Sequence, residues 1–197
     1  MSSQTEDIGV IVLAAGDSTR LGRPKQLVEF DGGTLLGHVV TTAIGVSPAH
    51  TVVVLGASAA VVRPDVELFA ATVVMNNGWK EGIAGSIRLG VETITSTNPN
   101  LRAVIMLTCD QPRVTVHLLR EMISCYDLIT NRIVACEYGD GIGIPALFDR
   151  AYFPALRGLR GGNGGKKILL GNLDQIIGVP FPGGAFDVDS ERDLDRL

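Results

Sequence analysis

The sequence predicts an α/β fold of three layers, with a mostly parallel sheet covered by helices on both faces. Runs rich in β-branched residues alternate along the chain with amphipathic helical patterns, as in proteins built from strand–helix–strand units. Two runs, TVVVL at 51–55 and AVIML at 103–107, are apolar without interruption, which is typical of strands buried on both faces. No internal repeat, low-complexity block or linker divides the 197 residues, so we expect one domain over residues 1–197.

The first half of the chain alternates strictly between expected strands and helices. Strands are predicted at 8–13, 51–55 and 72–75, and helices at 34–44, 58–64 and 83–95. Thr34 is the expected N-cap of the first helix, and Ser58 is that of the second, which we expect to end near Pro64. The third helix carries an apolar stripe at intervals of four residues, with which it can pack on the sheet.

The second half begins in the same way and then becomes irregular. We expect a strand at 103–107, a helix from Thr115 to about Leu128 and a strand at 132–136. Farther along, the sequence predicts a turn at 139–143, one or two short helices at 145–156, a Gly-rich loop at 158–165, a helix at 166–170 and a strand at 175–179. Ser190 opens a final helix, and Asp193 three positions later completes a capping box.

Composition excludes several classes of protein. The chain has 17 Lys plus Arg and 21 Asp plus Glu, and its net charge of −4 argues against a nucleic-acid binder. The three cysteines form no CxxC pair and indicate reduced thiols, so we expect a cytoplasmic protein. No apolar run approaches the ~18 residues of a membrane helix. The polar, acidic start MSSQTEDIG is not that of a signal peptide.

The loop after the first strand is the first candidate site, because ligands of such sheets bind beyond the carboxyl ends of the strands. It reads LAAGDSTRLGRPKQL over 13–27, and neither a GxGxxG fingerprint nor a Walker A motif fits it. Small residues at 14–16 allow backbone N–H groups to approach an anion, and Arg20 and Lys25 supply charge for a polyphosphate. The alternative is an ordinary strand-to-helix turn with two solvated cations.

Three aspartates form the second candidate site. Asp110 follows the buried strand at 103–107, and Asp187 and Asp189 flank Val188 just before the last helix. If that stretch is extended, both of its carboxylates point to one side. Mg²⁺ is typically held by one or two carboxylates together with phosphate oxygens and water. The alternative for Asp110 is a turn before the following proline, and for the other two it is helix capping.

Five motifs in the right order resemble the MobA-like nucleotidyltransferases, most of all the molybdenum cofactor cytidylyltransferase branch. The motifs are LAAG-x-S-x-R-x-G-x-P-K at 13–25, NNGWKEGIAGSIRLGV from Asn76, CDQP at 109–112, GIPALF at 143–148 and DVDSERDL at 187–194. The resemblance spans nearly the whole chain, and it implies a Rossmann-like nucleotidyltransferase fold.

The resemblance also implies roles for particular residues. Arg20 and Lys25 would hold the triphosphate, and Asp110 would act with them in catalysis. Asp110 would bind Mg²⁺, with Asp189 as the second ligand and Asp187 as the weaker candidate of that pair. The nucleotide-binding set implied in this way is Leu13, Ala14, Ala15, Gly16, Arg20, Lys25, Trp79 and Ser86. For Trp79, plain packing is an equal alternative.

The implied reaction transfers CMP from CTP to the phosphate of molybdenum-bound molybdopterin, giving molybdopterin cytosine dinucleotide for molybdenum hydroxylases. The resemblance further implies a monomer, with an apo-hydroxylase as a possible partner. Ala15-Gly16 and Pro24 favour CTP over the GTP of the guanylyl-transferring branch. Ile144 and Gly162 depart from the histidine and the acidic residue that relatives often have there, which leaves the acceptor open. The alternatives are an NAD(P)H-dependent reductase of quinone-like compounds on the same fold, a guanylyltransferase and a non-catalytic cofactor carrier.

Overall fold

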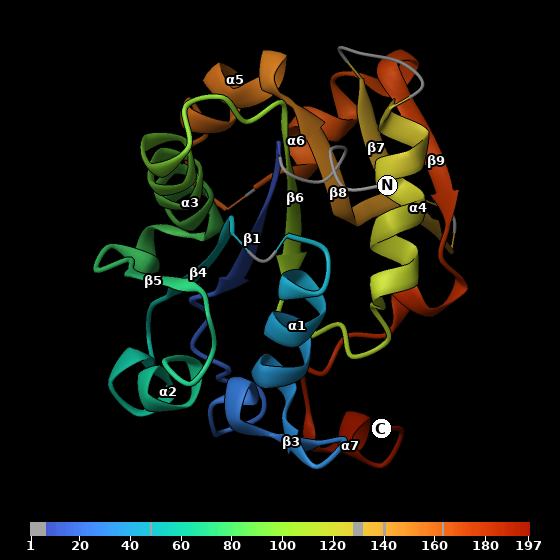
Figure 1. Ribbon diagram of the computed structural model, residues 1–197. Coiled ribbons are helices and arrows are strands. Elements are labelled where there is room, and N and C mark those ends of the chain that lie inside the picture. The colour runs from blue at the N-terminus through green and yellow to red at the C-terminus, as the bar shows by residue number, and fades with distance from the viewer. Residues whose placement is uncertain (1–6, 48, 128–131, 140, 163) are drawn as a thin grey trace.

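The computed structural model describes residues 7–47, 49–127, 132–139, 141–162 and 164–197. A seven-stranded sheet forms its centre, in the order β5-β4-β1-β6-β8-β7-β9 (Figure 1). Pairing is parallel throughout β5-β4-β1-β6 and between β7 and β9, whereas β8 runs antiparallel to β6 and β7. The strands of this sheet are β1 (Ile8–Ala14), β4 (Thr51–Leu55), β5 (Thr72–Met75), β6 (Ala103–Thr108), β7 (Ile133–Tyr138), β8 (Gly141–Asp149) and β9 (Ile176–Pro180).

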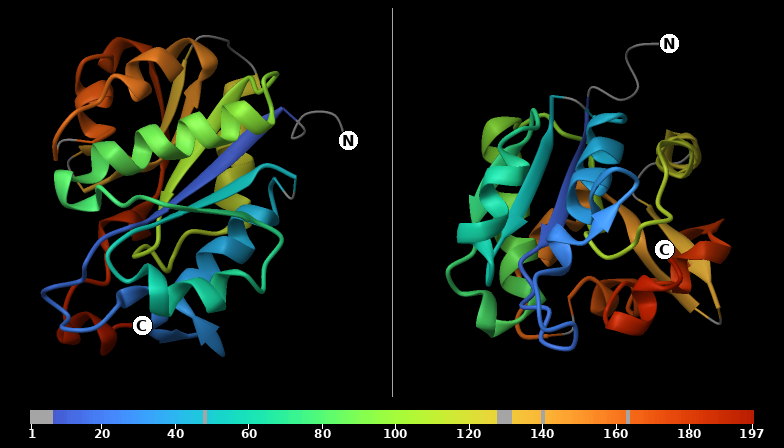
Figure 2. Two further views of the ribbon diagram at one scale, coloured as in Figure 1. Left: turned by 90° about the vertical axis from the view of Figure 1, so that its left-hand side faces the viewer. Right: turned by 90° about the horizontal axis from the view of Figure 1, so that it is seen from below.

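Helices cover both faces of this sheet, as Figure 2 shows from two further directions. One face packs against α1 (Leu35–Ile44), α2 (Ala59–Val66) and α4 (Val116–Asp127). The other packs against α3 (Ile83–Thr97), α5 (Phe153–Arg157) and α6 (Lys166–Leu170). A small hairpin of β2 (Glu29–Phe30) and β3 (Gly33–Thr34) and the last helix, α7 (Glu191–Leu194), lie at one end of the sheet. The predicted three-layer α/β fold is confirmed. Among the described residues, no helix combines the length and apolar character that crossing a membrane requires.

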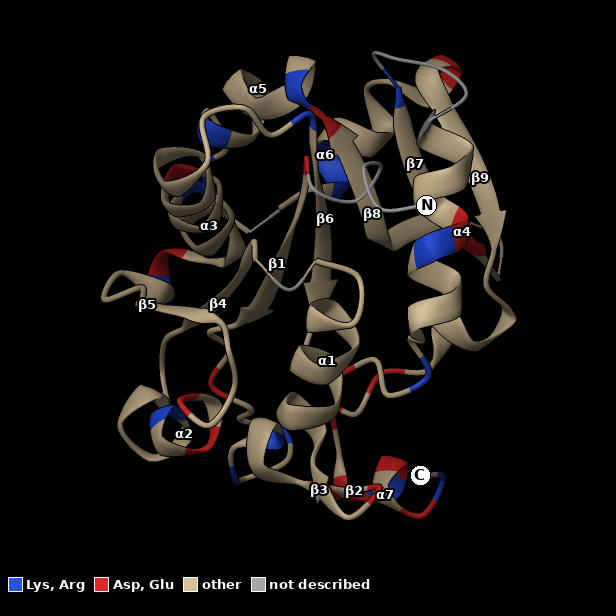
Figure 3. Ribbon diagram, viewed as in Figure 1, with Lys and Arg blue, Asp and Glu red and all other residues tan. Residues whose placement is uncertain are grey.

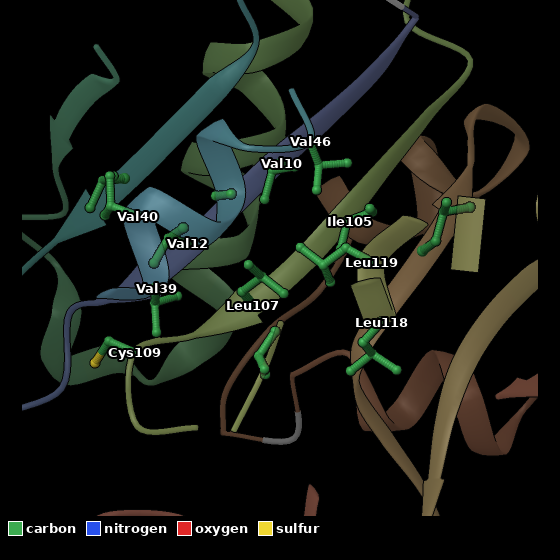
Figure 4. Packing of buried hydrophobic residues seen from close by; sticks show 14 of the residues in the cluster. Val10, Val12, Val39, Val40, Val46, Ile105, Leu107, Cys109, Leu118 and Leu119 are labelled. Carbon is green, nitrogen blue, oxygen red and sulfur yellow. The ribbon is translucent and has the colours of Figure 1, made fainter. Parts of the chain in front are cut away.

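The core is built from the uninterrupted apolar strands that the sequence indicated. On the α1 side, side chains of β1 and β6 meet those of α1 and α4, as Figure 4 shows for Val10, Val12, Val39, Val40, Ile105, Leu107, Leu118 and Leu119. On the other side, α3 lies close to β1 at Gly90, where an added Cβ would come within 2.6 Å of Ile11. The central strands are therefore fixed from both faces, and the loops at their ends start from rigid positions.

Most predicted elements lie within two residues of the observed ones. Thr34 caps α1 by accepting a 3.0 Å hydrogen bond from the backbone N–H of Gly37, as expected of an N-cap. The capping box of Ser190 and Asp193 is also present at the start of α7. The helix predicted from Thr115 is observed from Val116 to Asp127, and its expected end at Leu128 lies outside the described residues.

The second helix, expected to end near Pro64, ends at Val66, so that Pro64 lies inside its last turn. Ser58 occupies the N-cap position but makes no capping hydrogen bond with its side chain. The helix continues because Val62 and Val66 are buried against the sheet, and a proline removes only one backbone donor from so short a helix.

The predicted turn at 139–143 and the short helices at 145–156 were partly wrong, because residues 141–149 form strand β8. Pairing of β8 with β7 skips Ile144 and Pro145, which form a bulge between two paired stretches. A bulge accepts a proline because the backbone N–H that proline lacks is not needed for pairing there. A proline in a sequence usually argues against a central strand, and Pro145 therefore led to a different prediction for this segment. Helical structure begins only after it, with a 3-10 turn at Arg150–Tyr152 and then α5.

The order of the strands marks one place on the sheet. After β1 the chain passes to β4 and β5 on one side, and then returns to pair β6 on the other side of β1. The connections that follow β1 and β6 therefore diverge and leave a crevice at the carboxyl ends of these two strands.

Candidate functional site

The crevice is bordered by the loop after β1, the loop after β6 and the segment before α7. Figure 3 shows charged segments of the chain gathered at this end of the sheet, where α7 lies. The backbone N–H of Val188 donates a 2.9 Å hydrogen bond to the carbonyl of Asp110. Val188 is itself fully buried beside Leu21 and Val28. This anchor holds the two flanking aspartates next to the end of β6, although nearly eighty residues separate them in sequence.

Lys25 is the centre of the charged network. Its Nζ donates to Oδ2 of Asp110 at 2.8 Å and to Oδ1 of Asp189 at 2.7 Å. The other carboxylate oxygen of Asp189 accepts from Arg20 at 2.7 Å. The lysine side chain is 12% exposed, whereas that of Arg20 is 73% exposed. The structure thus brings together the predicted cations and two of the three predicted acids.

The protonation of this network follows from its geometry. Burial lowers the pKa of Lys25, but Asp110 and Asp189 outweigh it, so that its pKa lies above the usual value and the ammonium is retained. Desolvation likewise opposes ionisation of Asp189, and the hydrogen bonds and charges of Lys25 and Arg20 hold its pKa below the usual value. Burial, followed by the charge of Asp110, raises the pKa of the Cys109 thiol, which is therefore protonated and a poor nucleophile.

Asp187 differs from the other two aspartates. No described residue forms an ion pair with it, and its carboxyl group lies beside Asp110 and Asp189. Desolvation and repulsion by these two carboxylates raise the pKa of Asp187 to about 6. The D-x-D pair is therefore divided: one carboxylate is neutralised by cations, and the other adds negative charge to the crevice.

The loop after β1 has its carbonyl groups turned into the protein. Nε2 of Gln26, a side chain that is 1% exposed, donates to the carbonyls of Ala14 at 2.8 Å and Gly16 at 3.2 Å. The carbonyl of Ala15 accepts from the N–H of Ala57 at 3.1 Å. No described residue accepts a hydrogen bond from the Gly16 N–H, so that this donor is free for a ligand.

The first of two cavities in the crevice has a volume of about 380 Å³ and lies against this loop. Most of the predicted nucleotide-binding residues line it, namely Leu13, Ala15, Gly16, Lys25, Trp79 and Ser86. Asp110, predicted as a catalytic residue and metal ligand, lines it as well. Ala14 and Arg20 are not part of this lining. Ser86 is 2% exposed, and its hydroxyl accepts a hydrogen bond from Nδ2 of Asn76 at 3.0 Å. Trp79 is partly exposed and lies in a 3-10 turn (Trp79–Glu81) before α3.

The second cavity, of about 460 Å³, lies on the other side of Asp110. Asp110, Thr108 and Ile83 line both cavities, so that the carboxylate of Asp110 stands at their junction. Ile144 and Gly162, which left the acceptor open in the sequence analysis, both line the second cavity. Asp187 lines it as well.

The oxygen donors of this site fit a hard divalent cation, since Asp110 and Asp189 lie within reach of one ammonium group. Among the described residues, no group of three His, Cys, Asp or Glu side chains is arranged to hold a metal ion. A cation that used both carboxylates would have to displace Lys25 from between them. Its remaining ligands would then come from substrate oxygens and water, as is usual for Mg²⁺.

Sequence reasoning missed the two buried glutamines. Gln26 stabilises the loop after β1, and Gln111 (4% exposed) donates from Nε2 to the carbonyls of Ile144 at 3.0 Å and Gly184 at 3.3 Å. Both follow directly after a predicted charged residue, in the sequences PKQ and CDQ. No local pattern marks either glutamine as buried, because the hydrogen-bond partners of Gln111 are distant in sequence and only folding identifies the partners of both.

Comparison with known proteins agrees with this geometry. Residues 10–176 match the family of the MobA-like NTP transferase domain. Among curated relatives, bifunctional protein GlmU of Thermobifida fusca is 30% identical over 135 residues, which are 66% of this chain but only 28% of that protein. Nicotine blue oxidoreductase of Paenarthrobacter nicotinovorans is 27% identical over 198 residues, covering 95% of this chain and 94% of that one.

A solved structure gives a match of the same extent. The crystal structure of Rv0371c from Mycobacterium tuberculosis H37Rv is 31% identical, covers 98% of both chains and superimposes with a TM-score of 0.84. A second structure of that protein, with 28% identity and a TM-score of 0.74, is a complex with manganese. Because the family match covers most of the chain and includes the loop after β1 and the end of β6, the chain belongs to the MobA-like NTP transferase domain family.

Proposed function

We propose that the chain is a cytidylyltransferase that moves CMP from CTP to the phosphate of molybdenum-bound molybdopterin. The observation that carries the proposal is the position of Asp110, which lies between two cavities and contacts Lys25 in the loop after β1. Transfer of a nucleotidyl group requires the donor and the acceptor to meet at one place, and the two cavities would hold one substrate on each side of Asp110. The products are molybdopterin cytosine dinucleotide and pyrophosphate, which would serve the maturation of molybdenum hydroxylases.

In the proposed reaction, the nucleotide occupies the first cavity, with its phosphates toward Lys25 and the free N–H of Gly16. An oxygen of the acceptor phosphate attacks the α-phosphorus, and the bond from that phosphorus to the bridging oxygen of pyrophosphate breaks. Lys25 and Arg20 neutralise the charge that develops on the leaving pyrophosphate. No covalent bond to the protein forms, so the catalytic contribution is positioning and electrostatic stabilisation.

We assign Asp110 and Asp189 as the residues that would hold Mg²⁺, with Asp187 as the alternative to Asp189. When bound, the ion would neutralise phosphate charge and favour displacement at phosphorus. Support for a divalent cation comes from the oxygen donor set and from the manganese complex of Rv0371c. The ion would displace the ammonium group of Lys25 from between the two carboxylates. Lys25 would then be available to pair with the phosphates of the nucleotide.

The nucleotide is proposed to be CTP because of Ala15-Gly16 and Pro24 in the loop after β1, with GTP as the alternative. We further propose that residues 1–197 act as one domain, as a monomer in the cytoplasm, with an apo-hydroxylase as the partner that receives the product. Ile144 and Gly162 both line the second cavity. The alternative to molybdopterin is therefore a different acceptor, or a chain that has lost the ability to bind an acceptor.

The test begins with thermal-shift measurements using CTP, GTP, ATP and NADPH, each with and without Mg²⁺. A ligand at ~100 times its Kd stabilises a protein by ~2.7 kcal/mol, which corresponds to several degrees at ~2–4 °C per kcal/mol for this chain length. We expect CTP with Mg²⁺ to give the largest shift. Pyrophosphate release from CTP in the presence of molybdopterin is the second step. Absence of both the shift and the release would contradict the proposal.

A second candidate function is reduction of a quinone-like compound by a nicotinamide cofactor. It is favoured by the match to nicotine blue oxidoreductase, which extends over nearly the whole of both chains. In that case the first cavity would hold the phosphates of NADPH. A melting-temperature shift with NADPH alone, together with NADPH oxidation by the purified protein, would establish this function and exclude the transferase.

A further inference from the structure

The second cavity has walls built mainly from backbone. Two segments of the chain supply them, one from β8 and one from the loop before α6, with glycines at 141, 143, 162, 164 and 165. An added Cβ at Gly143 would collide with the hydroxyl of Tyr138. Gly164 has a φ of +48°, and its Cβ would lie 2.7 Å from Ile83. The walls therefore require glycine at 143 and 164, and they present peptide groups and apolar side chains to whatever the cavity holds.

One wall is fixed by buried hydrogen bonds. The carbonyl of Ile144 accepts from the hydroxyl of Tyr138 and from Nε2 of Gln111, each at 3.0 Å. The amide group of Gln111 is buried, and its Oε1 has no partner among the described residues. Leaving a buried acceptor without a donor is unfavourable. A ligand that brings an N–H group to this wall would provide the missing donor.

The charges on the cavity are opposed. Asp110 and Asp187 lie at the end near the junction, and Lys166, at the start of α6, is the cation among the described lining residues. Lys166 is exposed and forms no ion pair with a described residue. An anionic acceptor that approaches Asp110 is repelled by two carboxylates. Lys25 lines only the first cavity, and the divalent cation proposed between Asp110 and Asp189 would lie at the junction. Lys166 is therefore the cation that the described lining residues supply on the acceptor side itself.

We propose that Lys166 binds the phosphate of the acceptor in the second cavity. The proposal rests on the proposed function and adds the residue that positions its acceptor: the phosphate is held between Lys166 and the junction at Asp110. Lys166 then offsets the repulsion from Asp187 and orients the attacking oxygen.

The experiment measures the contribution of the phosphate in the parent chain and two variants. A pterin that carries a phosphate monoester and the same pterin with a free hydroxyl group are titrated into the full chain with Mg²⁺, and binding is followed by pterin fluorescence. Lys166→Met removes the proposed partner. Lys167→Met is the matched control, because it removes the same charge from the next residue of α6, which does not line the cavity.

We expect the phosphate to improve binding about tenfold in the parent and the Lys167 variant, and less than threefold in the Lys166 variant. A tenfold effect corresponds to ~1.4 kcal/mol, within the range of a charge-assisted hydrogen bond. If the phosphate advantage fell equally in both variants, or in neither, the proposal would be overturned. The phosphate would then be bound through the general charge of α6 or through another residue. Melting temperatures of both exposed-site variants verify folding.

The outcome is separable from that of the proposed function. If CTP and Mg²⁺ stabilise the chain but neither pterin binds, the acceptor subsite is wrong and nucleotidyl transfer stands. If the phosphate advantage depends on Lys166 but CTP does not bind, the subsite stands and the nucleotide assignment is wrong.

Discussion

The two cavities that meet at Asp110 are built by different means. The first is held by side-chain contacts: Gln26 fixes two carbonyls of the loop after β1, and Lys25 joins that loop to the carboxylates. The second is shaped by glycines and by the bulge at Ile144-Pro145, with few charged groups. The difference leads us to expect that the proposed nucleotide cavity keeps its shape, whereas the specificity of the second depends on the particular residues placed along its backbone walls.

The largest expected effect comes from the residue that the two cavities share. Asp110→Asn removes the charge that pairs with Lys25 and the oxygen ligand proposed for Mg²⁺, so we expect turnover to fall by about 10³-fold or more. Turnover is measured as pyrophosphate release from CTP. Asp7→Asn is the control, because Asp7 lies just before the opposite end of β1 and pairs with Arg102. A folded Asp110 variant with more than a tenth of parental turnover would show that the junction is not catalytic.

Lys25→Met separates the nucleotide from the metal ion. The variant should lose CTP binding, yet bind Mn²⁺ without nucleotide about tenfold more tightly than the parent, because the ammonium no longer occupies the space between Asp110 and Asp189. Mn²⁺ binding is followed by electron paramagnetic resonance of the free ion. Arg23→Met removes a charge from the same loop, where it faces Glu191 instead, and should change neither value. Weaker Mn²⁺ binding in the Lys25 variant would disprove this competition.

Gln26→Glu disturbs the first cavity alone. A carboxylate at this position would face two carbonyl oxygens that now accept hydrogen bonds, so the loop after β1 should turn its N–H groups away from the nucleotide. We expect the KM for CTP to rise about tenfold and the KM for the acceptor to change less than twofold, consistent with loss of two hydrogen bonds worth ~0.5–1.5 kcal/mol each. Gln26→Met, which loses the donors without adding charge, should have a smaller effect in the same direction. A parallel rise in both KM values would indicate general disruption of the fold.

The smallest effect concerns the uncompensated carboxylate of the second cavity. Below pH ~3 this carboxyl is protonated in the folded and unfolded chains, so Asp187→Asn should leave the melting temperature unchanged. Between pH ~4 and about 6 the unfolded chain loses this proton while the folded chain retains it, because the pKa of Asp187 is raised there, so the parent loses stability over this window. Since Asp187 is exposed and screened by solvent, we expect stabilisation of only about 1–3 °C at pH 7.5 without metal. Destabilisation of the variant at pH 7.5 would mean that the ionised form has a partner.

The regular part of the fold could be predicted because each element there carries its own signal. Continuous β-branched runs marked β4 and β6, and capping residues marked α1 and α7. Strand β8 could not be predicted, because glycines and Pro145 break its pattern, and it forms only by pairing with β6 and β7. In the candidate site, the charged residues were found from motifs, whereas Gln26 and Gln111 were missed because their partners are distant in sequence.

By itself the sequence determined most of the strands and helices, the position of the charged loop after β1 and the identity of the acids that could accompany it. These properties are local, since they depend on periodicity, capping and residue type within short segments. Only the tertiary structure decided that Lys25 lies between Asp110 and Asp189, that no described residue forms an ion pair with Asp187, and that two cavities meet at one carboxylate. The physical reason is that ion pairing and desolvation depend on distances between segments far apart in the chain, which packing sets and spacing in sequence does not.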